Sequence, residues 1–186
     1  MNSQSTAHIP RGWRIEDLYD QTGKRFLITG GTSGLGRETA RELARNGAQV
    51  TITARSVKKA EETLNEIASE KVDYLEMDLT DLESVRKAAR SVTGNYDALI
   101  LNAGIMAIPF AKTVDGFETQ MSTNHLGHFA FSGLIKNQIS HRIITVSSFA
   151  HRMGSFGSGS LDEIRDIALG KNKYSPWGAY GTSKLA

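Results

Sequence analysis

Tyr180 and Lys184 are the two residues of this chain whose types and spacing suggest chemistry most directly. Side chains four positions apart lie on one face of a helix, so the phenol and the ammonium can meet there. A nearby ammonium favours the phenolate form and brings the ordinary phenol pKa of ~10 towards neutral pH. Such a pair could give a proton to a carbonyl oxygen or take one from an alcohol. Because the pair also arises by chance, its position along the chain decides its meaning.

A glycine-rich segment, TGGTSGLG at positions 29–36, lies between an apolar run and a helical pattern. This is the setting of a phosphate-binding turn. Gly30 can form the tight turn, Gly34 lets the backbone approach a pyrophosphate, and Gly36 lets the helix pack closely on the strand. The helix N-terminus would direct its N–H groups and dipole at the anion. The candidate residues for binding a dinucleotide here are Gly30, Thr32, Ser33, Gly34, Leu35 and Gly36.

Two alternatives to a dinucleotide site exist for this segment. A P-loop requires a Lys followed by Ser or Thr after its last glycine, but Arg37 and Glu38 stand there. An NTPase is therefore disfavoured. The glycines could also serve only to turn the chain.

Arg55, at the end of the second expected strand, bears on the choice of coenzyme. NAD sites of this type place a carboxylate about 20 residues after the glycine motif, where it binds the ribose 2′-hydroxyl. A guanidinium suits a 2′-phosphate instead, so the sequence favours NADP over NAD. The alternative is that Arg55 is an ordinary solvated loop charge.

Strand-like and helix-like segments alternate from residue 25, which is the pattern of βαβ units on a parallel sheet. We therefore expect an α/β fold with a doubly wound parallel sheet. The expected strands are 25–29, 50–53, 72–78, 98–101 and 143–146. The expected helices are 35–46, one capped by Ser56, one opened by Thr80 and Glu83 as a capping box, 117–135, a short one near 161–169, and one from about 177.

Apolar residues at helical spacing mark the helix faces that should pack on the sheet. They are Leu35, Ala40, Leu43 and Ala44 in the first helix, Val57, Ala60, Leu64 and Ile67 in the second, and Leu82, Val85, Ala89 and Val92 in the third.

Length and composition bound the class of protein. The chain has 186 residues, the size of one domain, and no Cys, so thiolate metal sites and cysteine nucleophiles are excluded. Its net charge of +2 comes from interspersed residues, which disfavours a nucleic-acid interface. The sequence shows no membrane span or signal-peptide core, so we expect a cytoplasmic protein. We expect residues 1–22 to form an N-terminal tail and lead-in, and residues 23–186 the NADP-binding domain.

Five motifs, in the expected order, resemble those of the short-chain dehydrogenase/reductase family. They are TGxxxGxG from Thr29, Asn102-Ala103-Gly104, Asn124, Ser147-Ser148 and Tyr180-x-x-x-Lys184. The flanking segments LNAGIM, STNHLGHFAF, RIITVSSFAH and AYGTSKLA are similar to the retinol-dehydrogenase-like and WW-domain-oxidoreductase-like branch. The resemblance implies a Rossmann-type sheet ordered 3-2-1-4-5, which further strands, absent from this chain, continue in the family.

The resemblance implies a role for each member of a catalytic set. Tyr180 would exchange the proton with the substrate, and Lys184 would lower the phenol pKa and bind the nicotinamide ribose. Ser148, rather than Ser147, would hydrogen-bond the substrate oxygen. Asn124 would hold a water in a relay to Lys184, or would be an ordinary surface amide of a helix. The implied activity is interconversion of an alcohol and a carbonyl by hydride transfer to or from NAD(P), and Arg55 favours NADP.

The residues after the third and fourth expected strands are also implied in coenzyme binding, together with the Tyr and Lys of the catalytic set. They are Asp78, Leu79, Asn102, Ala103 and Gly104. The last three would lie beside the coenzyme where the strand order reverses. Asp78 would lie near the adenine, but it could equally form a turn.

The His and Phe residues in the fourth expected helix and in the segment before it are not expected to bind a ligand. His125 and His128 are three apart, but no acid at ligand spacing completes a metal site. No metal is therefore expected. The aromatic residues expected in the core or in a subunit contact are Phe110, Phe117, Phe129 and Phe131.

The chain ends two residues after Lys184, so we expect it to be incomplete and catalytically weak or silent. Its last helix is too short to be stable alone, and strand 143–146 would form an exposed edge. The expected partner is a small alcohol or carbonyl substrate, and a homodimer of a full-length form is left open. The alternative function is a dinucleotide-binding module without turnover, or an inactive fragment of such an enzyme.

Overall fold

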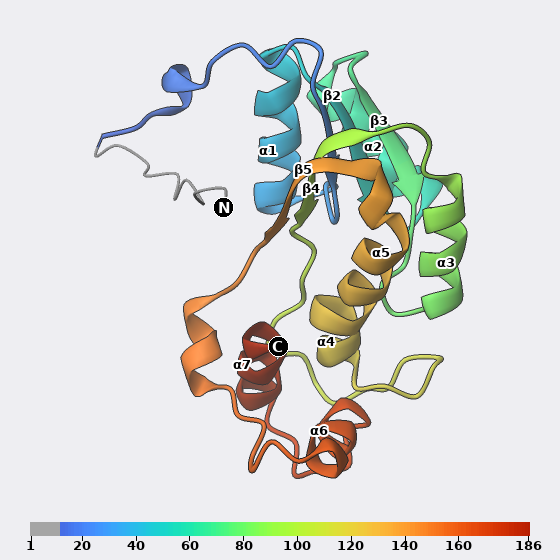
Figure 1. Ribbon diagram of the computed structural model, residues 1–186, viewed down its shortest axis with the longest axis vertical. Helices are drawn as coiled ribbons and strands as arrows, with labels where there is room; N and C mark the ends of the chain where they lie inside the picture. Colours follow the sequence, from blue (N-terminus) through green and yellow to red (C-terminus); the bar gives the residue numbers. More distant parts are fainter. Residues whose placement is uncertain (1–11) are drawn as a thin grey trace, which may run out of the picture.

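The computed structural model describes residues 12–186. The first half of the expected N-terminal lead-in, residues 1–11, lies outside the described residues. Five strands form one parallel sheet in the order β3-β2-β1-β4-β5, as the resemblance predicts (Figure 1). The strands are β1 (Arg25–Ile28), β2 (Gln49–Ala54), β3 (Val72–Glu76), β4 (Tyr96–Leu101) and β5 (Ile139–Thr145).

Helices follow each of the first four strands, and a long connection follows β5. The helices are α1 (Gly34–Arg45), α2 (Val57–Ile67), α3 (Leu82–Ser91), α4 (Thr119–Met121), α5 (Gly127–Ile135), α6 (Leu161–Ala168) and α7 (Pro176–Leu185). Short 3₁₀ turns are η1 (Ile15–Asp17), η3 (Lys136–Gln138) and η4 (Phe149–Met153), and η2 (Ser122–Leu126) is a π-helical turn between α4 and α5. No helix within residues 12–186 is both long and apolar enough to cross a membrane.

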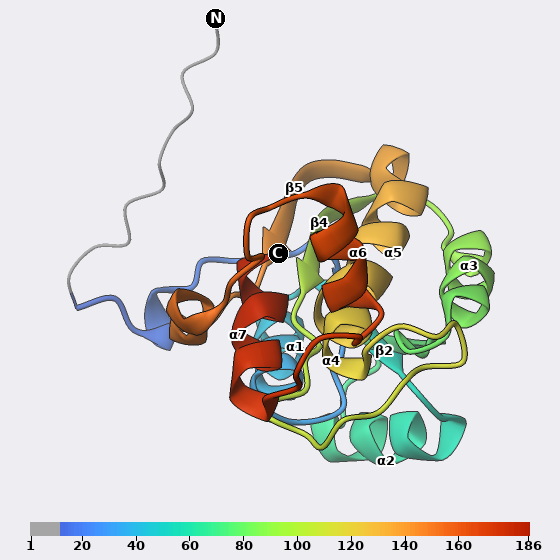
Figure 2. The ribbon, with the colours of Figure 1, turned by 90° about the horizontal axis from the view of Figure 1, so that it is seen from below.

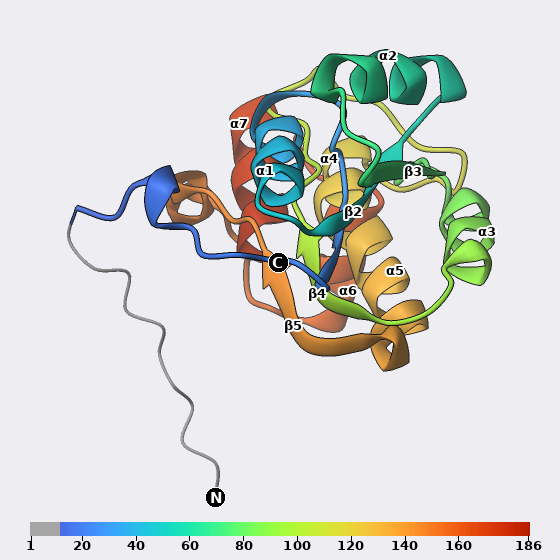
Figure 3. The ribbon, with the colours of Figure 1, turned by 90° about the horizontal axis from the view of Figure 1, so that it is seen from above.

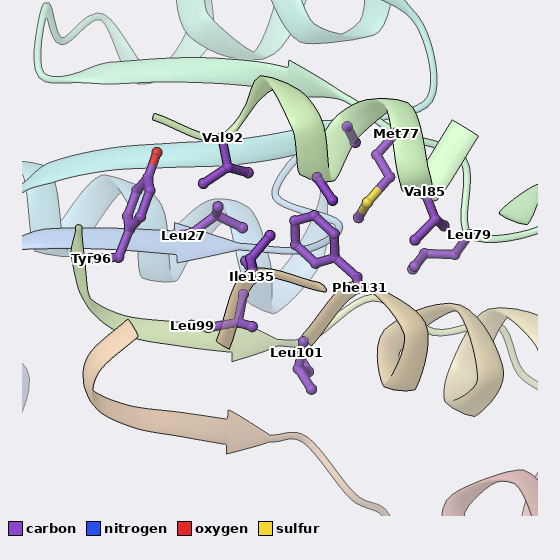
Figure 4. Close-up of a cluster of buried hydrophobic side chains, with 12 residues drawn as sticks. Leu27, Met77, Leu79, Val85, Val92, Tyr96, Leu99, Leu101, Phe131 and Ile135 are labelled. Atoms are coloured by element: carbon purple, nitrogen blue, oxygen red, sulfur yellow. The ribbon is translucent and has the colours of Figure 1, made fainter. Parts of the chain in front are cut away.

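Helices cover both faces of the sheet, which gives a three-layer arrangement (Figure 3). On one face, Phe131 and Ile135 of α5 and Val85 of α3 pack with Leu27 and Leu99 of the central strands (Figure 4). The buried alanines of α1 and the last residue of α2 pack on the opposite face. The doubly wound prediction is therefore confirmed. Most residues of β2 and β4, and the second half of β1, are buried between the two layers of helices.

Two of the predicted inward-facing residues are wrong. Leu35 is 75% exposed and Val57 is 42% exposed. The buried residues of α1 recur every four positions from Gly36, and Leu35 is turned from that row by about 100°. Val57 is the first residue of α2 and precedes its first buried position, Ala60. Both residues lie in the first turn of their helices, on the side that faces solvent.

The predicted capping box of α3 is also wrong. The cap is Asp81, whose carboxylate accepts hydrogen bonds from the N–H groups of Glu83 (2.9 Å) and Ser84 (3.3 Å). Thr80 instead donates its hydroxyl to Asp78 Oδ1 at 2.7 Å. Asp78 therefore forms the turn that precedes the helix, and the helix begins one residue later than the capping-box pattern implies.

The long helix predicted over 117–135 begins later and is not uniform. Glu118 caps it by accepting the N–H groups of Gln120 (2.9 Å) and Met121 (2.8 Å). The next five residues form the π-helical turn η2, whose wider winding precedes α5. Such turns occur often at functional sites. Here it carries Asn124.

Candidate active site

The candidate site residues lie at the carboxyl ends of the strands. The glycine-rich segment follows β1, and Asn102 follows the neighbouring strand β4. The strand order reverses between β1 and β4, because the chain leaves β1 towards β2 and later returns to β4 on the other side of β1. Ligands of such sheets bind at this point. Helix α7, which carries Tyr180 and Lys184, lies beside α4 near this end of the sheet (Figures 1 and 2).

The N-terminus of α1 has the features that a pyrophosphate requires. Ser33 precedes the helix, but its side chain makes no capping hydrogen bond, so the first N–H groups of α1 keep their donors for a ligand. Gly34 adopts a φ of +52°, and a side chain there would meet nothing within 4 Å. Ser33, Gly34 and Leu35 are exposed, whereas Thr32 is half-buried. An anion can therefore reach the helix end from solvent.

Asn102 holds the glycine segment to β4. Its side-chain amide donates to the backbone oxygen atoms of Thr29 (2.9 Å) and Gly30 (3.3 Å). In return, Thr29 Oγ1 accepts the N–H groups of Asn102 (2.9 Å) and Ala103 (3.1 Å). Asn102 and Ala103 thus fix the shape of the glycine loop. Gly36 packs tightly here, because a methyl group on it would lie 2.5 Å from the Asn102 amide and from the Gly30 oxygen.

Asn124 is buried at 7% exposure, which overturns the alternative of a surface amide. Its Oδ1 accepts the Ile105 N–H at 2.8 Å, and its amide donates to the Ile105 oxygen at 2.9 Å. The second amide proton goes to Ser183 Oγ at 2.8 Å. Asn124 therefore joins η2 to the segment after β4 and to α7.

Lys184 reaches the same point from α7. Its Nζ donates to the Val146 backbone oxygen at 2.9 Å and has two further protons to give. A methyl group on Gly104 would lie 3.3 Å from both Lys184 Nζ and Asn124 Oδ1, so these two polar atoms converge on Gly104. Burial lowers the pKa of Lys184. Tyr180, one helical turn earlier, is half-buried and meets Trp177 edge to face at 6.2 Å between ring centroids.

The two serines after β5 differ in what their hydroxyl groups can still do. Ser147 Oγ donates to the Lys184 backbone oxygen at 3.2 Å, which uses its proton. Ser148 Oγ accepts the Ala150 N–H at 3.2 Å, as the cap of η4, and keeps its proton for another acceptor. Ser148 is half-buried, whereas Ser147 is exposed. The geometry favours Ser148 as a donor to a substrate.

The remaining candidate coenzyme residues follow β2 and β3, and they differ in how far their side chains are free to meet a ligand. Arg55 directly follows β2 and is exposed. Asp78 is engaged in its own turn, where Oδ1 also accepts the Thr80 N–H at 2.8 Å. The side chain of Leu79 is buried at 5% exposure in the core, so only its backbone could meet a ligand.

The aromatic residues and histidines of the α4–α5 region divide into buried and exposed ones. Phe131 is fully buried, but Phe129 is 72% exposed. His125 stacks on Phe129, whereas His128 is buried beneath the site, so the two imidazoles do not converge. Within residues 12–186 no group of three or more His, Asp or Glu side chains could hold a metal ion.

Three residues that connect the site received no such role from the sequence. They are Thr29, His128 and Ser183. Each is polar and nearly or fully buried, but its partner is distant in sequence: Thr29 and His128 are 99 positions apart, and Asn124 and Ser183 are 59 apart. A polar residue inside an apolar helical row, such as His128 three before Phe131, was the only signal available.

Comparisons with known proteins agree with this architecture. A family model described as "short chain dehydrogenase" matches residues 24–160. A Streptomyces lividans protein named "Probable oxidoreductase" is 43% identical over 175 residues, covering 90% of this chain and 57% of the relative. Retinol dehydrogenase 12 of Mus musculus is 39% identical over 175 residues, covering 88% and 53%. The chain therefore spans little more than half the length of these relatives.

A solved structure extends the comparison to three dimensions. The crystal structure of an uncharacterized protein from Mycobacterium paratuberculosis matches with a TM-score of 0.85 and 47% sequence identity. The match covers 94% of this chain and 62% of that chain.

Proposed function

The chain belongs to the short-chain dehydrogenase family, whose members are NAD(P)-dependent oxidoreductases, and from this premise we propose that it interconverts an alcohol and a carbonyl with NADP as the coenzyme. One observation carries the proposal. Lys184 Nζ and Asn124 Oδ1 converge on Gly104, beside the glycine loop. Lys184 is one helical turn from Tyr180. Relatives named retinol dehydrogenase support an alcohol or carbonyl as the substrate class.

The residues present fit a dinucleotide. The uncapped N-terminus of α1 would hold the pyrophosphate, and the open space at Gly34 would admit it. The ribose of the nicotinamide half would meet the two free Nζ protons of Lys184. When bound, the nicotinamide supplies or accepts the hydride.

Tyr180 would serve as the acid towards a carbonyl oxygen and as the base towards an alcohol. Two side chains would assist it. The positive charge of Lys184, on the same helix face, favours the phenolate. Ser148 would donate its free hydroxyl proton to the substrate oxygen and so fix the distance to the phenol. Proton transfer by a positioned group of this kind accelerates reactions by about 10²–10⁴-fold.

NADP is proposed over NAD because of Arg55. The guanidinium is exposed at the end of β2, and a carboxylate that would repel a 2′-phosphate is absent from this position. Bidentate charge-assisted bonds between Arg and phosphate are among the strongest polar contacts in proteins.

The experiment measures NADPH consumption with a panel of aldehydes and ketones in a protein that carries this chain. Consumption that depends on the carbonyl compound supports an oxidoreductase. Saturable NADPH fluorescence without consumption would instead support a coenzyme-binding module without turnover, and would refute the proposed catalysis.

A further inference from the structure

His128 lies between the two halves of the proposed site. It is on α5 and is 4% exposed. Its Nε2 lies 2.8 Å from the hydroxyl oxygen of Thr29, at the start of the glycine loop. Its Nδ1 lies 3.1 Å from the backbone oxygen of Asn124, in the π-helical turn. One imidazole ring thus bridges the coenzyme loop and the turn that meets Lys184.

The hydrogen bonds around His128 can all be made with only one placement of protons. The backbone oxygen of Asn124 can only accept, so Nδ1 carries the hydrogen. In the neutral ring Nε2 is then an acceptor and takes the hydroxyl proton of Thr29. The two lone pairs of that hydroxyl accept the N–H groups of Asn102 and Ala103. The Thr29 hydroxyl also lies 3.5 Å from the Ile100 backbone oxygen, but the 2.8 Å contact with Nε2 is the shorter of the two and takes the proton.

The other protonation states leave a buried mismatch. A charged imidazole would present Nε2–H to a Thr29 oxygen that already accepts two N–H groups. The opposite neutral tautomer would set the Nδ1 lone pair against the Asn124 oxygen, which costs the free energy of an unsatisfied buried group. Burial lowers the pKa of His128 to about 4, although the hydrogen bond to the Asn124 oxygen acts in the opposite direction. The charge of Lys184 lowers the pKa further.

We propose that His128, held as the neutral Nδ1–H tautomer, is a positioning residue that keeps the glycine loop and the Asn124 turn in register. Through Thr29 it shapes the coenzyme loop. Through the backbone of Asn124 it fixes the π-helical turn, and the side chain of Asn124 then reaches Ser183 and Gly104. The inference rests on the proposed function and assigns a role to a residue outside the Ser, Tyr, Lys and Asn set.

The tautomer is tested directly by ¹⁵N–¹H correlation spectra of this chain labelled at histidine. We expect His128 to show a protonated Nδ1 and an unprotonated Nε2 near neutral pH. An Nε2–H tautomer or a charged ring would overturn the proposal. This measurement needs neither coenzyme nor turnover, so it separates the inference from the proposed function.

Two substitutions of His128 by amide residues each keep one of its hydrogen bonds and remove the other. In His128→Asn the amide lies near Nδ1 and can still donate to Asn124, but it cannot reach Thr29. In His128→Gln the side-chain oxygen lies near Nε2 and can accept from Thr29, but the donor to Asn124 is lost. We expect the Asn variant to weaken NADPH binding about tenfold and the Gln variant to lower kcat about tenfold with binding nearly unchanged.

A purely structural role for His128 gives a different pattern. Both variants would then lower the melting temperature and change affinity and kcat by the same factor, and that result would overturn the proposal. Unchanged affinity and kcat in both variants would overturn it as well. Failure of the wild-type chain to bind NADPH would refute the proposed function, while the tautomer measurement would still decide whether His128 makes the bridge.

Discussion

Asn124 donates its side-chain amide to Ser183 Oγ at 2.8 Å, and this bond ties the π-helical turn to α7. Ser183 in turn donates to the Tyr180 backbone oxygen at 2.8 Å. The bond is buried at both ends, so its loss would leave unsatisfied polar groups beside the proposed catalytic pair. The helix of Tyr180 and Lys184 is therefore positioned by a polar contact as well as by packing.

Replacement of Tyr180 by Phe removes the proposed proton donor and leaves the ring. We expect turnover to fall by about 10²–10⁴-fold, while NADPH affinity changes little, because the phenol serves proton transfer. Steady-state kinetics and NADPH fluorescence titration measure the two quantities. Tyr19→Phe is the control, since Tyr19 is 71% exposed in the N-terminal lead-in. Activity of Tyr180→Phe within about tenfold of wild type would contradict the assignment.

Replacement of Arg55 by Asp should reverse the coenzyme preference. The carboxylate would repel the 2′-phosphate of NADP and could accept the 2′-hydroxyl of NAD. We expect a change in discrimination of about 1.5–3 kcal/mol for the lost charged contact, measured by titration of both coenzymes. Lys136→Asp makes the same charge change in η3, just before β5 starts and away from the carboxyl ends of the strands, and should leave the preference intact. Equal affinities in the wild type would refute the NADP preference.

A side chain at Gly181 should separate α7 from η4. A methyl group there would lie 2.7 Å from the Ala150 oxygen and 2.9 Å from the Gly154 nitrogen, both backbone atoms. We expect Gly181→Ala to lower the free energy of unfolding by about 1–3 kcal/mol, because the two backbones must move apart. Gly178→Ala, in the same helix, meets Ser175 at an ordinary 3.4 Å and should be neutral or stabilising. Denaturant unfolding of both variants measures these free energies. Equal stabilities of the two variants would show that α7 and η4 are not tightly packed at Gly181.

Burial of His128 should make the fold less stable in acid. Because its pKa falls from 6.5 to about 4, the unfolded chain binds more protons between these pH values. Stability then rises with pH over this window, and the native state loses roughly 3 kcal/mol between pH 7 and pH 4 from this group. In His128→Gln this contribution is absent. The difference in unfolding free energy between wild type and variant should therefore shrink as the pH falls, and a constant difference would contradict the depressed pKa.

The sheet and the position of the site could be predicted from the sequence, because buried parallel strands appear as short apolar runs and family motifs follow them in order. The details at helix ends could not. Thr80 has the residue type of a helix cap, but its hydroxyl donates a hydrogen bond to Asp78, and Asp81 caps the helix instead. The contact of His128 with Thr29 joins residues 99 positions apart, and local spacing carries no signal for such a pair.

Binding of NADP at the N-terminus of α1 is measured by titrating NADPH fluorescence into wild type, Ser33→Ala and Ser33→Asp. Ser33→Asp would cap the free N–H groups with its own carboxylate, which preserves the helix and repels a pyrophosphate. We expect saturable binding to wild type and Ser33→Ala, tighter for NADPH than for NADH, and at least about tenfold weaker binding to a folded Ser33→Asp. Absence of saturable binding to the wild type, or equal binding by Ser33→Asp, would contradict it.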